Sequence, residues 1–413
     1  MMKFFEHFIA VCALSVGIAG SASAQKNPDL APTPPMGWNS WNFFGKAAIN
    51  EQVCLEVMDA MAERGLIRAG YNYFVIDGGW RDKLNEKGEI TVHPEKFPRG
   101  IKFLADYAHS KGLKFGLHTV PGRFDCGGDH VGGWNNEEVQ VKQFVSWGVD
   151  FIKLDKCRFD MGADKKPVPW ELEVEKEVYH KWAKMLRECG RDITFSISAY
   201  RYLDWYPEWC NMARTTGDIM SRGSGGCYFE RSDISGKKSL FTVMEIADKN
   251  ERLYMHAGNG YWNDPDMLAI GEQGLTMEEQ KIHFALWCIM GSPLFLGNDP
   301  RNLSAEEVAM ITNRDAIRVN QEIQAEAQGR RIYKEGDLEI WKKELAGGKC
   351  ALLLLNRSRD RAGSIHADFA KLGLSAKMKV KNIYTAADYG VCKDFLHDFT
   401  ARGGIFLLLE KVK

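Results

Sequence analysis

Four short segments of this chain each run into an aspartate, and this pattern constrains the fold more than any other feature. They are residues 73–77, 151–155, 214–218 and 261–264, which end on Asp77, Asp155, Asp218 and Asp264. Acidic side chains at the ends of successive strands are typical of a parallel barrel, whose active site lies at the carboxyl ends of its strands. The sequence therefore predicts that these aspartates gather at one end of a barrel.

The strongest of these patterns is in residues 150–157 (DFIKLDKC), where a lysine accompanies the aspartate. Side chains two residues apart on a strand project from the same face, so we expect Lys153 beside Asp155. An ammonium group near a carboxylate favours its ionised form, which a carboxylate nucleophile requires. A lone K-x-D would also fit a salt bridge at a strand end, but the three companion segments favour a catalytic pair.

The order of the predicted elements defines the fold class. Strand patterns alternate with helical patterns about eight times over residues 25–317, which predicts a (β/α)8 TIM barrel. From residue 318 to 413 the chain contains short strands, such as 338–342, 350–356 and 405–409, separated by Gly, Asp and Asn. This pattern indicates a C-terminal antiparallel β domain.

The first 24 residues have the composition of a signal peptide. A lysine at position 3 precedes an apolar stretch over residues 8–20, and small residues follow at 22–24. We expect the mature chain to begin near Gln25 and to be exported, to the periplasm or the outside of a bacterial cell. Cys12 leaves with the signal, so an odd number of the 10 cysteines remains and at least one thiol should stay free.

Charge and motifs exclude several classes of function. Lys and Arg total 54 against 55 for Asp and Glu, so no nucleic-acid or anionic-lipid partner is expected. No stretch after the signal reaches the ~18–20 apolar residues of a membrane helix. The sequence contains no C-x-x-C, H-E-x-x-H, G-x-G-x-x-G or Walker motif, so we expect neither a metal nor a nucleotide cofactor.

Three longer motifs resemble those of one known family. They are residues 33–42 (TPPMGWNSWN), residues 260–268 (GYWNDPDML), and residues 319–321 (VNQ) followed by 328–331 (QGRR). The family is the melibiases, glycoside hydrolase family 27, whose type member is α-galactosidase. Because the motifs occur in the family's order along nearly the whole mature chain, the chain is identified as a member, with a barrel and a β-sandwich.

The resemblance implies an exo-acting, retaining glycoside hydrolase that acts on an oligosaccharide or glycoconjugate by double displacement. Asp155 matches the family's nucleophile and Asp218 its acid/base. An oxocarbenium-like transition state needs one ionised carboxylate and one protonated acid, which agrees with these roles. Asp218 must keep its proton until transfer, which burial and negative neighbours would favour. Cys126 and Cys157 match a disulfide that links two active-site loops.

Candidate substrate contacts also follow from the resemblance and from strand geometry. If residues 214–218 are extended, Arg214 projects from the same face as Asp218. Asp264 and Asp266 are expected to brace the turn at Pro265 through bonds to backbone. Trp38 and Trp80 are expected to form pocket walls that stack on the sugar, although packing in the core is equally consistent with the two residues. The predicted substrate-binding residues are Trp38, Asp77, Trp80, His118, Lys153, Tyr200 and Arg214.

Three positions depart from the galactosidase pattern. Gly78 stands where the family has a second acid that holds the axial hydroxyl, Ala199 replaces a glutamate, and His118 replaces a tyrosine. Each hydrogen bond lost from a buried site costs on the order of 1–3 kcal/mol, so these changes affect sugar choice. Three interpretations remain open. The protein is an α-galactosidase with a relaxed pocket, an enzyme with the same mechanism on a β-L-arabinopyranoside, α-N-acetylgalactosaminide or α-glucoside, or a non-catalytic carbohydrate-binding protein. Retention of the catalytic pair with Lys153 and Arg214 argues against the last.

Overall fold

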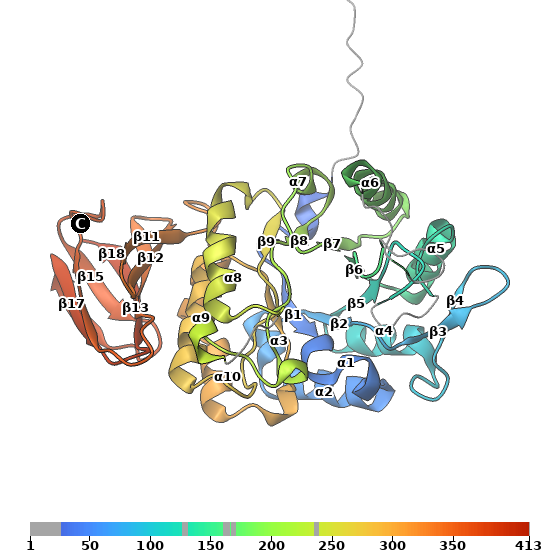
Figure 1. The fold of residues 1–413 in the computed structure, drawn as a ribbon, viewed down its shortest axis with the longest axis horizontal. Helices are drawn as coiled ribbons and strands as arrows, with labels where there is room; N and C mark the ends of the chain where they lie inside the picture. Colours follow the sequence, from blue (N-terminus) through green and yellow to red (C-terminus); the bar gives the residue numbers. More distant parts are fainter. Residues whose placement is uncertain (1–25, 126–130, 160–165, 167–170, 235–238, 413) are drawn as a thin grey trace, which may run out of the picture.

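The computed structural model describes residues 26–125, 131–159, 166, 171–234 and 239–412, which form a barrel followed by a β-sandwich domain (Figure 1). The predicted signal peptide, residues 1–24, lies outside the described residues. Within the described ranges, no helix is both long and apolar enough to cross a membrane.

The barrel contains eight parallel strands in the order β10-β1-β2-β5-β6-β7-β8-β9. Leu268, which follows β9, pairs in parallel with Leu296 of β10 and closes the sheet through a single bridge. The predicted TIM barrel is therefore confirmed. Its strands are β1 (Met36–Asn39), β2 (Tyr73–Ile76), β5 (Lys114–Thr119), β6 (Phe151–Asp155), β7 (Thr194–Ser198), β8 (Met212–Arg214), β9 (Trp262–Asp264) and β10 (Leu294–Leu296).

Helices surround the barrel, and their ends follow local capping signals. Asn50 accepts a hydrogen bond from the Val53 amide at the start of α2, and Thr276 with Glu279 forms a capping box at α9. The α-helices are α1 (Trp41–Ala48), α2 (Glu51–Glu63), α3 (Leu66–Ala69), α4 (Gly100–Ser110), α5 (Glu137–Trp147), α6 (Leu172–Glu188), α7 (Tyr206–Trp209), α8 (Val243–Asn250), α9 (Met277–Ile289), α10 (Ala305–Ile311) and α11 (Arg314–Gln321). The connections carry the hairpin β3 (Arg81–Leu84) and β4 (Ile90–Val92), and the 3-10 turns η1 (Pro28–Leu30), η2 (Arg222–Ser224), η3 (Arg231–Asp233), η4 (Glu251–His256) and η5 (Pro300–Asn302).

One predicted strand is shorter than expected. Residues 214–218 are not extended throughout, because β8 ends at Arg214 and the chain then turns. The threonine hydroxyls that follow bond to other loops: Thr215 Oγ1 donates to Asn250 Oδ1 at 2.7 Å, and Thr216 Oγ1 to the Pro265 carbonyl at 3.0 Å. These side-chain bonds replace a strand ladder, so Asp218 lies on a loop at the carboxyl end of β8.

The C-terminal domain is antiparallel, as predicted. A six-stranded sheet in the order β11-β12-β13-β18-β15-β16 faces the two-stranded sheet β14-β17, and apolar side chains from both sheets form one buried cluster. Helix α11 runs across the predicted domain boundary at residue 317, and the boundary itself remains a prediction. The strands are β11 (Arg330–Glu335), β12 (Leu338–Leu345), β13 (Lys349–Asn356), β14 (Gly363–Asp368), β15 (Met378–Asn382), β16 (Asp388–Cys392), β17 (Asp394–Phe399) and β18 (Gly404–Lys411).

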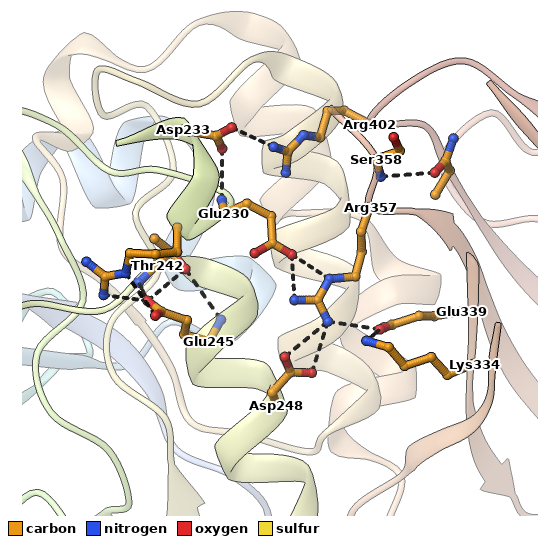
Figure 2. Close-up of polar contacts among 12 residues, drawn as sticks. Glu230, Asp233, Thr242, Glu245, Asp248, Lys334, Glu339, Arg357, Ser358 and Arg402 are labelled. Carbon is orange, nitrogen blue, oxygen red and sulfur yellow. Dashed lines mark hydrogen bonds and ion pairs between the residues drawn. The ribbon is translucent and has the colours of Figure 1, made fainter. Parts of the chain in front are cut away.

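A network of ion pairs joins the two domains beside the contact of α9 with β13 and β18 (Figures 1 and 2). The side chain of Glu339 on β12 is fully buried and accepts from Arg357 Nη1 at 2.9 Å, Arg331 Nη1 at 2.9 Å and Lys334 Nζ at 2.8 Å. Arg357 also contacts Asp248 on α8 of the barrel at 3.1 Å. Glu339 is thus the buried anion around which cations of the sandwich meet carboxylates of the barrel.

A buried lysine of the sandwich caps the last helix of the barrel. Lys343 on β12 is fully buried, and its Nζ donates to the carbonyls of Val319 at 2.8 Å and Asn320 at 3.1 Å, close to the end of α11. Carbonyls in the last turn of a helix have no partner within the helix. The second domain therefore supplies donors that the first domain lacks.

Candidate active site

Asp155, the last residue of β6, is buried and surrounded by hydrogen-bond donors. Its Oδ1 accepts from the Tyr200 hydroxyl at 2.6 Å and from the Cys157 amide at 3.0 Å, and its Oδ2 accepts from Ser198 Oγ at 3.1 Å. Burial opposes ionisation, but Lys153 and these hydrogen bonds outweigh it and lower the pKa of Asp155. The carboxylate is therefore ionised and held in one orientation.

Lys153 lies between two carboxylates. Its Nζ is 2.8 Å from Asp77 Oδ2 and 3.5 Å from Asp155 Oδ2, so the predicted proximity to Asp155 is observed, although Asp77 is the closer partner. Asp77 is further fixed by Asn39 Nδ2 at 3.1 Å and by the Gly78 amide at 2.9 Å. Against the effect of burial, Lys153 lowers the pKa of Asp77 well below its ordinary range. Both acids therefore carry negative charge near one cation.

The second group of carboxylates shares an arginine. Buried Arg214 donates through Nη2 to Asp218 Oδ1 at 3.0 Å and lies 2.9 Å from Asp266 Oδ2, while the side chain of Asp218 is 51% exposed. Asp266 Oδ2 also accepts from the Ile219 amide at 2.8 Å. Burial and the nearby Asp218 and Asp264 raise the pKa of Asp266 to about 6, against the effect of Arg214. Asp266 thus braces the Asp218 loop. Within their own turn, Asp264 Oδ1 accepts from the Asp266 amide at 2.9 Å and Asp266 Oδ1 from the Met267 amide at 2.7 Å, as predicted.

The two groups are neighbours, because Tyr200 donates to Asp155 and its ring lies 5.6 Å from the Arg214 guanidinium carbon. The two cations, Lys153 and Arg214, also line one small pocket, together with Asn39, Asp264 and Asp266. One group therefore carries an ionised, hydrogen-bonded aspartate, Asp155, and the other carries a half-exposed aspartate on a loop, Asp218. Such a pair can attack a substrate from one side and exchange a proton on the other.

The two tryptophans predicted to line the pocket, Trp38 and Trp80, are buried in the core instead. Trp38 is fully buried, stacks on Phe74 with ring centroids 4.7 Å apart, and donates its indole N–H to the Asn298 carbonyl. Trp80 is also fully buried and packs edge-on against Trp147 at 5.9 Å. The prediction that these indoles stack on sugar is wrong, because both side chains belong to the core between the strands and the helices.

Two aromatic residues make contacts that the sequence did not predict. Trp41 is partly exposed, packs against the cluster inside the barrel, and lies 3.1 Å from the place where a Cβ on Gly78 would be. Tyr200, predicted to contact substrate, instead donates to Asp155, and its backbone has a φ of 63°. The absence of a side chain at Gly78 was visible in the sequence, but the indole beside it was not.

Two further predictions concern the cysteines and metal binding. Cys157 is disulfide-bonded, whereas its predicted partner, Cys126, lies outside the described residues, so the pairing stays a prediction. No group of three or more His, Cys, Asp or Glu side chains among the described residues is arranged to hold a metal ion.

Comparison with known proteins places this geometry in a family. The melibiase family model described as alpha galactosidase A matches residues 33–322, and one described as alpha galactosidase C-terminal beta sandwich domain matches residues 335–402. Alpha-galactosidase A of Cellvibrio japonicus is 38% identical over 85% of this chain and 82% of its own length. Alpha-galactosidase 2 of Arabidopsis thaliana is 33% identical over 95% and 93%, respectively.

A solved structure gives the same result. Alpha-galactosidase I of Mortierella vinacea matches with a TM-score of 0.81 at 29% identity, covering 93% of this chain and 98% of that one. The fold, the paired carboxylates and these relatives define a glycoside hydrolase of the α-galactosidase type. The chain belongs to the melibiase family, glycoside hydrolase family 27.

Proposed function

We propose that this enzyme removes terminal α-galactosyl residues with retention of configuration, using Asp155 as nucleophile and Asp218 as acid/base. The observation that carries the proposal is the contrast between the two carboxylates. Asp155 is buried, ionised and held by three donors. Asp218 is half exposed on a loop, and among the described residues Arg214 alone holds its carboxylate. A nucleophile must be fixed and charged, and an acid/base must reach the leaving group and exchange its proton with water.

The reaction proceeds in two displacements. Asp155 forms a bond to the anomeric carbon while Asp218 gives its proton to the departing glycosidic oxygen, which leaves a glycosyl-enzyme ester. Asp218, now ionised, takes a proton from a water molecule as that water attacks the anomeric carbon and releases Asp155. Lys153 offsets the charge of Asp155 in the free enzyme and at the end of the cycle. Two inversions give net retention.

The choice of galactose is supported by the relatives, which are named alpha-galactosidases, and by retention of Asp77 with Lys153. The test is hydrolysis of aryl α-galactoside, α-N-acetylgalactosaminide, β-L-arabinopyranoside and α-glucoside, with the first-formed sugar anomer followed by proton NMR. We expect α-galactoside to have the highest kcat/KM and to release α-galactose first. Initial release of the β anomer, or preference for another sugar, would overturn the proposed stereochemistry or specificity.

We propose further that the chain is exported and that Cys157 pairs with Cys126. The composition of residues 1–24 supports export, and the disulfide at Cys157 supports an oxidising compartment. Intact mass and peptide mapping of the chain made in a bacterium with its own N-terminus test both points. The expected product begins near Gln25 and gives a cross-linked peptide with both cysteines; an uncleaved chain with a different pairing would contradict them.

A further inference from the structure

His118, the residue that departs from the family's tyrosine, points an unpartnered ring nitrogen into the site. The side chain is buried on β5, and its Nε2 lies 3.8 Å from Asp77 Oδ1 and 3.8 Å from Asp155 Oδ2. These distances exceed a hydrogen bond, and Nε2 has no partner among the described residues. A buried polar atom without a partner costs free energy unless a ligand satisfies it.

The other ring nitrogen faces an arginine. Arg81, the first residue of β3, places Nη2 3.3 Å from His118 Nδ1 and 3.2 Å from Asp125 Oδ2, and the side chains of Arg81 and Asp125 are almost fully buried. A guanidinium only donates, so Nδ1 must accept. In a neutral imidazole whose Nδ1 accepts, the proton is on Nε2. Trp80 Nε1 donates to the His118 carbonyl at 3.2 Å and fixes the backbone as well.

Burial is the main reason that this ring stays neutral. Burial lowers the pKa of His118, and Arg81 and Lys153 act in the same direction, whereas Asp77 and Asp155 oppose them. A second proton on Nδ1 would face the Arg81 guanidinium. His118 is therefore a neutral donor, and each carboxylate beside it only accepts when ionised. A sugar hydroxyl between them can donate to a carboxylate and accept from Nε2 together.

We propose that Arg81, anchored by Asp125, is a positioning residue that fixes His118 as a neutral Nε2–H donor to a sugar hydroxyl held against Asp77. The inference rests on the proposed function, because it concerns how that pocket recognises its sugar. It assigns to His118 part of the hydroxyl recognition that Gly78 cannot provide, and it restricts the substrate to pyranosides that carry a hydroxyl at this place.

The first test needs no turnover. In protein labelled with ¹⁵N-histidine, His118 is assigned by the signal lost in His118→Gln, and its two ring nitrogens are followed between pH 5 and 8. We expect the Nε2–H form in the wild type at neutral pH, with any titration below the ordinary value. In Arg81→Lys, which keeps a charge near Asp125 but loses the fork, we expect a mixture of tautomers. An Nδ1–H form in the wild type, or titration near the ordinary value of about 6.5, overturns the proposal.

The second test uses a matched pair of substitutions. The amide nitrogen of Gln can replace Nε2, whereas that of Asn can replace only Nδ1. We expect His118→Asn to lower kcat/KM for an aryl α-galactoside about 100-fold, mostly through KM, and His118→Gln to lose about 10-fold or less. Equal losses in the two variants, with an active wild type, contradict the proposed donor.

A set of monodeoxy galactosides identifies the hydroxyl. If Nε2–H donates to one hydroxyl, the wild type loses activity on the galactoside that lacks this hydroxyl. On that analogue His118→Asn should be no less active than the wild type, whereas on every other analogue it should be less active. The same factor on every analogue would overturn the inference. The proposed function fails separately, if the wild type does not hydrolyse α-galactosides at all, since the tautomer of His118 is measured independently.

Discussion

Replacing Asp155 with Asn lowers kcat by a factor on the order of 10⁴ or more, the scale seen when a covalent nucleophile is removed from a hydrolase. The amide has nearly the same shape but does not attack the anomeric carbon. Lys153 keeps Asp77 as its closer partner at 2.8 Å, so the substitution leaves no unpaired buried cation. We therefore expect a folded protein that still binds substrate.

Azide distinguishes a lost nucleophile from a lost acid/base. With Asp155→Asn, azide attacks the face that Asp155 occupied and gives a glycosyl azide of inverted configuration. With Asp218→Asn as the matched variant, azide intercepts the glycosyl-enzyme and the product retains its configuration. The anomer of each azide product is read by NMR. Exchange of these two outcomes would mean that the assigned roles are reversed.

Asp155→Asn should also change how the stability of the protein depends on pH in acid. The pKa of Asp155 is lowered in the folded state, so its ionised form contributes stability that is present above the unfolded value of about 3.9. That contribution is lost as pH falls through the folded-state pKa. We therefore expect the Tm of Asp155→Asn to fall less steeply than that of the wild type below about pH 4, measured by calorimetry.

Replacing Glu339 with Gln destabilises the protein by about 3–5 kcal/mol, because it removes the buried anion shared by Arg331, Lys334 and Arg357. The measurement is the midpoint and slope of urea unfolding. Glu344→Gln is the matched control: it lies on the same strand, pairs with Lys342 at 2.8 Å and is 43% exposed.

We expect the control to change stability by less than about 1 kcal/mol, since exposed ion pairs contribute little. Similar losses in the two variants would show that the network between the domains is not a buried anion site. An unchanged slope would mean that stability, rather than the compactness of either state, has changed.

Much of the fold and of the catalytic centre could be predicted from the sequence, because both depend on local periodicity. A lysine and an aspartate two positions apart on a strand share a face, and parallel strands bring their ends together, so Lys153 and Asp155 followed directly. The same periodicity did not say which face of β1 looks inward. Trp38 alternates with Asn39, and only the closed barrel shows that Asn39 faces the pocket while the indole packs outward.

The remaining features depend on contacts between distant parts of the chain. Arg81 begins a hairpin after β2 and Asp125 lies in the loop after β5, and neither segment carries a motif that links it to His118. Asp218 meets Arg214 because a loop folds back. In a continuous strand the two side chains would share a face but lie about 13 Å apart. Sequence periodicity therefore identified the residues whose position is local and missed those positioned by tertiary packing.

The lysine that caps α11 has a consequence for how this enzyme can be taken apart. Lys343 belongs to the sandwich by sequence, yet its Nζ donates to two carbonyls of the barrel, Val319 and Asn320. A barrel without the sandwich would therefore end in an uncapped helix, and the apolar surface that packs against the sandwich would be exposed to water. Chimeras that exchange the sandwich for another module must bring a donor of the same reach, so the two domains are a single engineering unit.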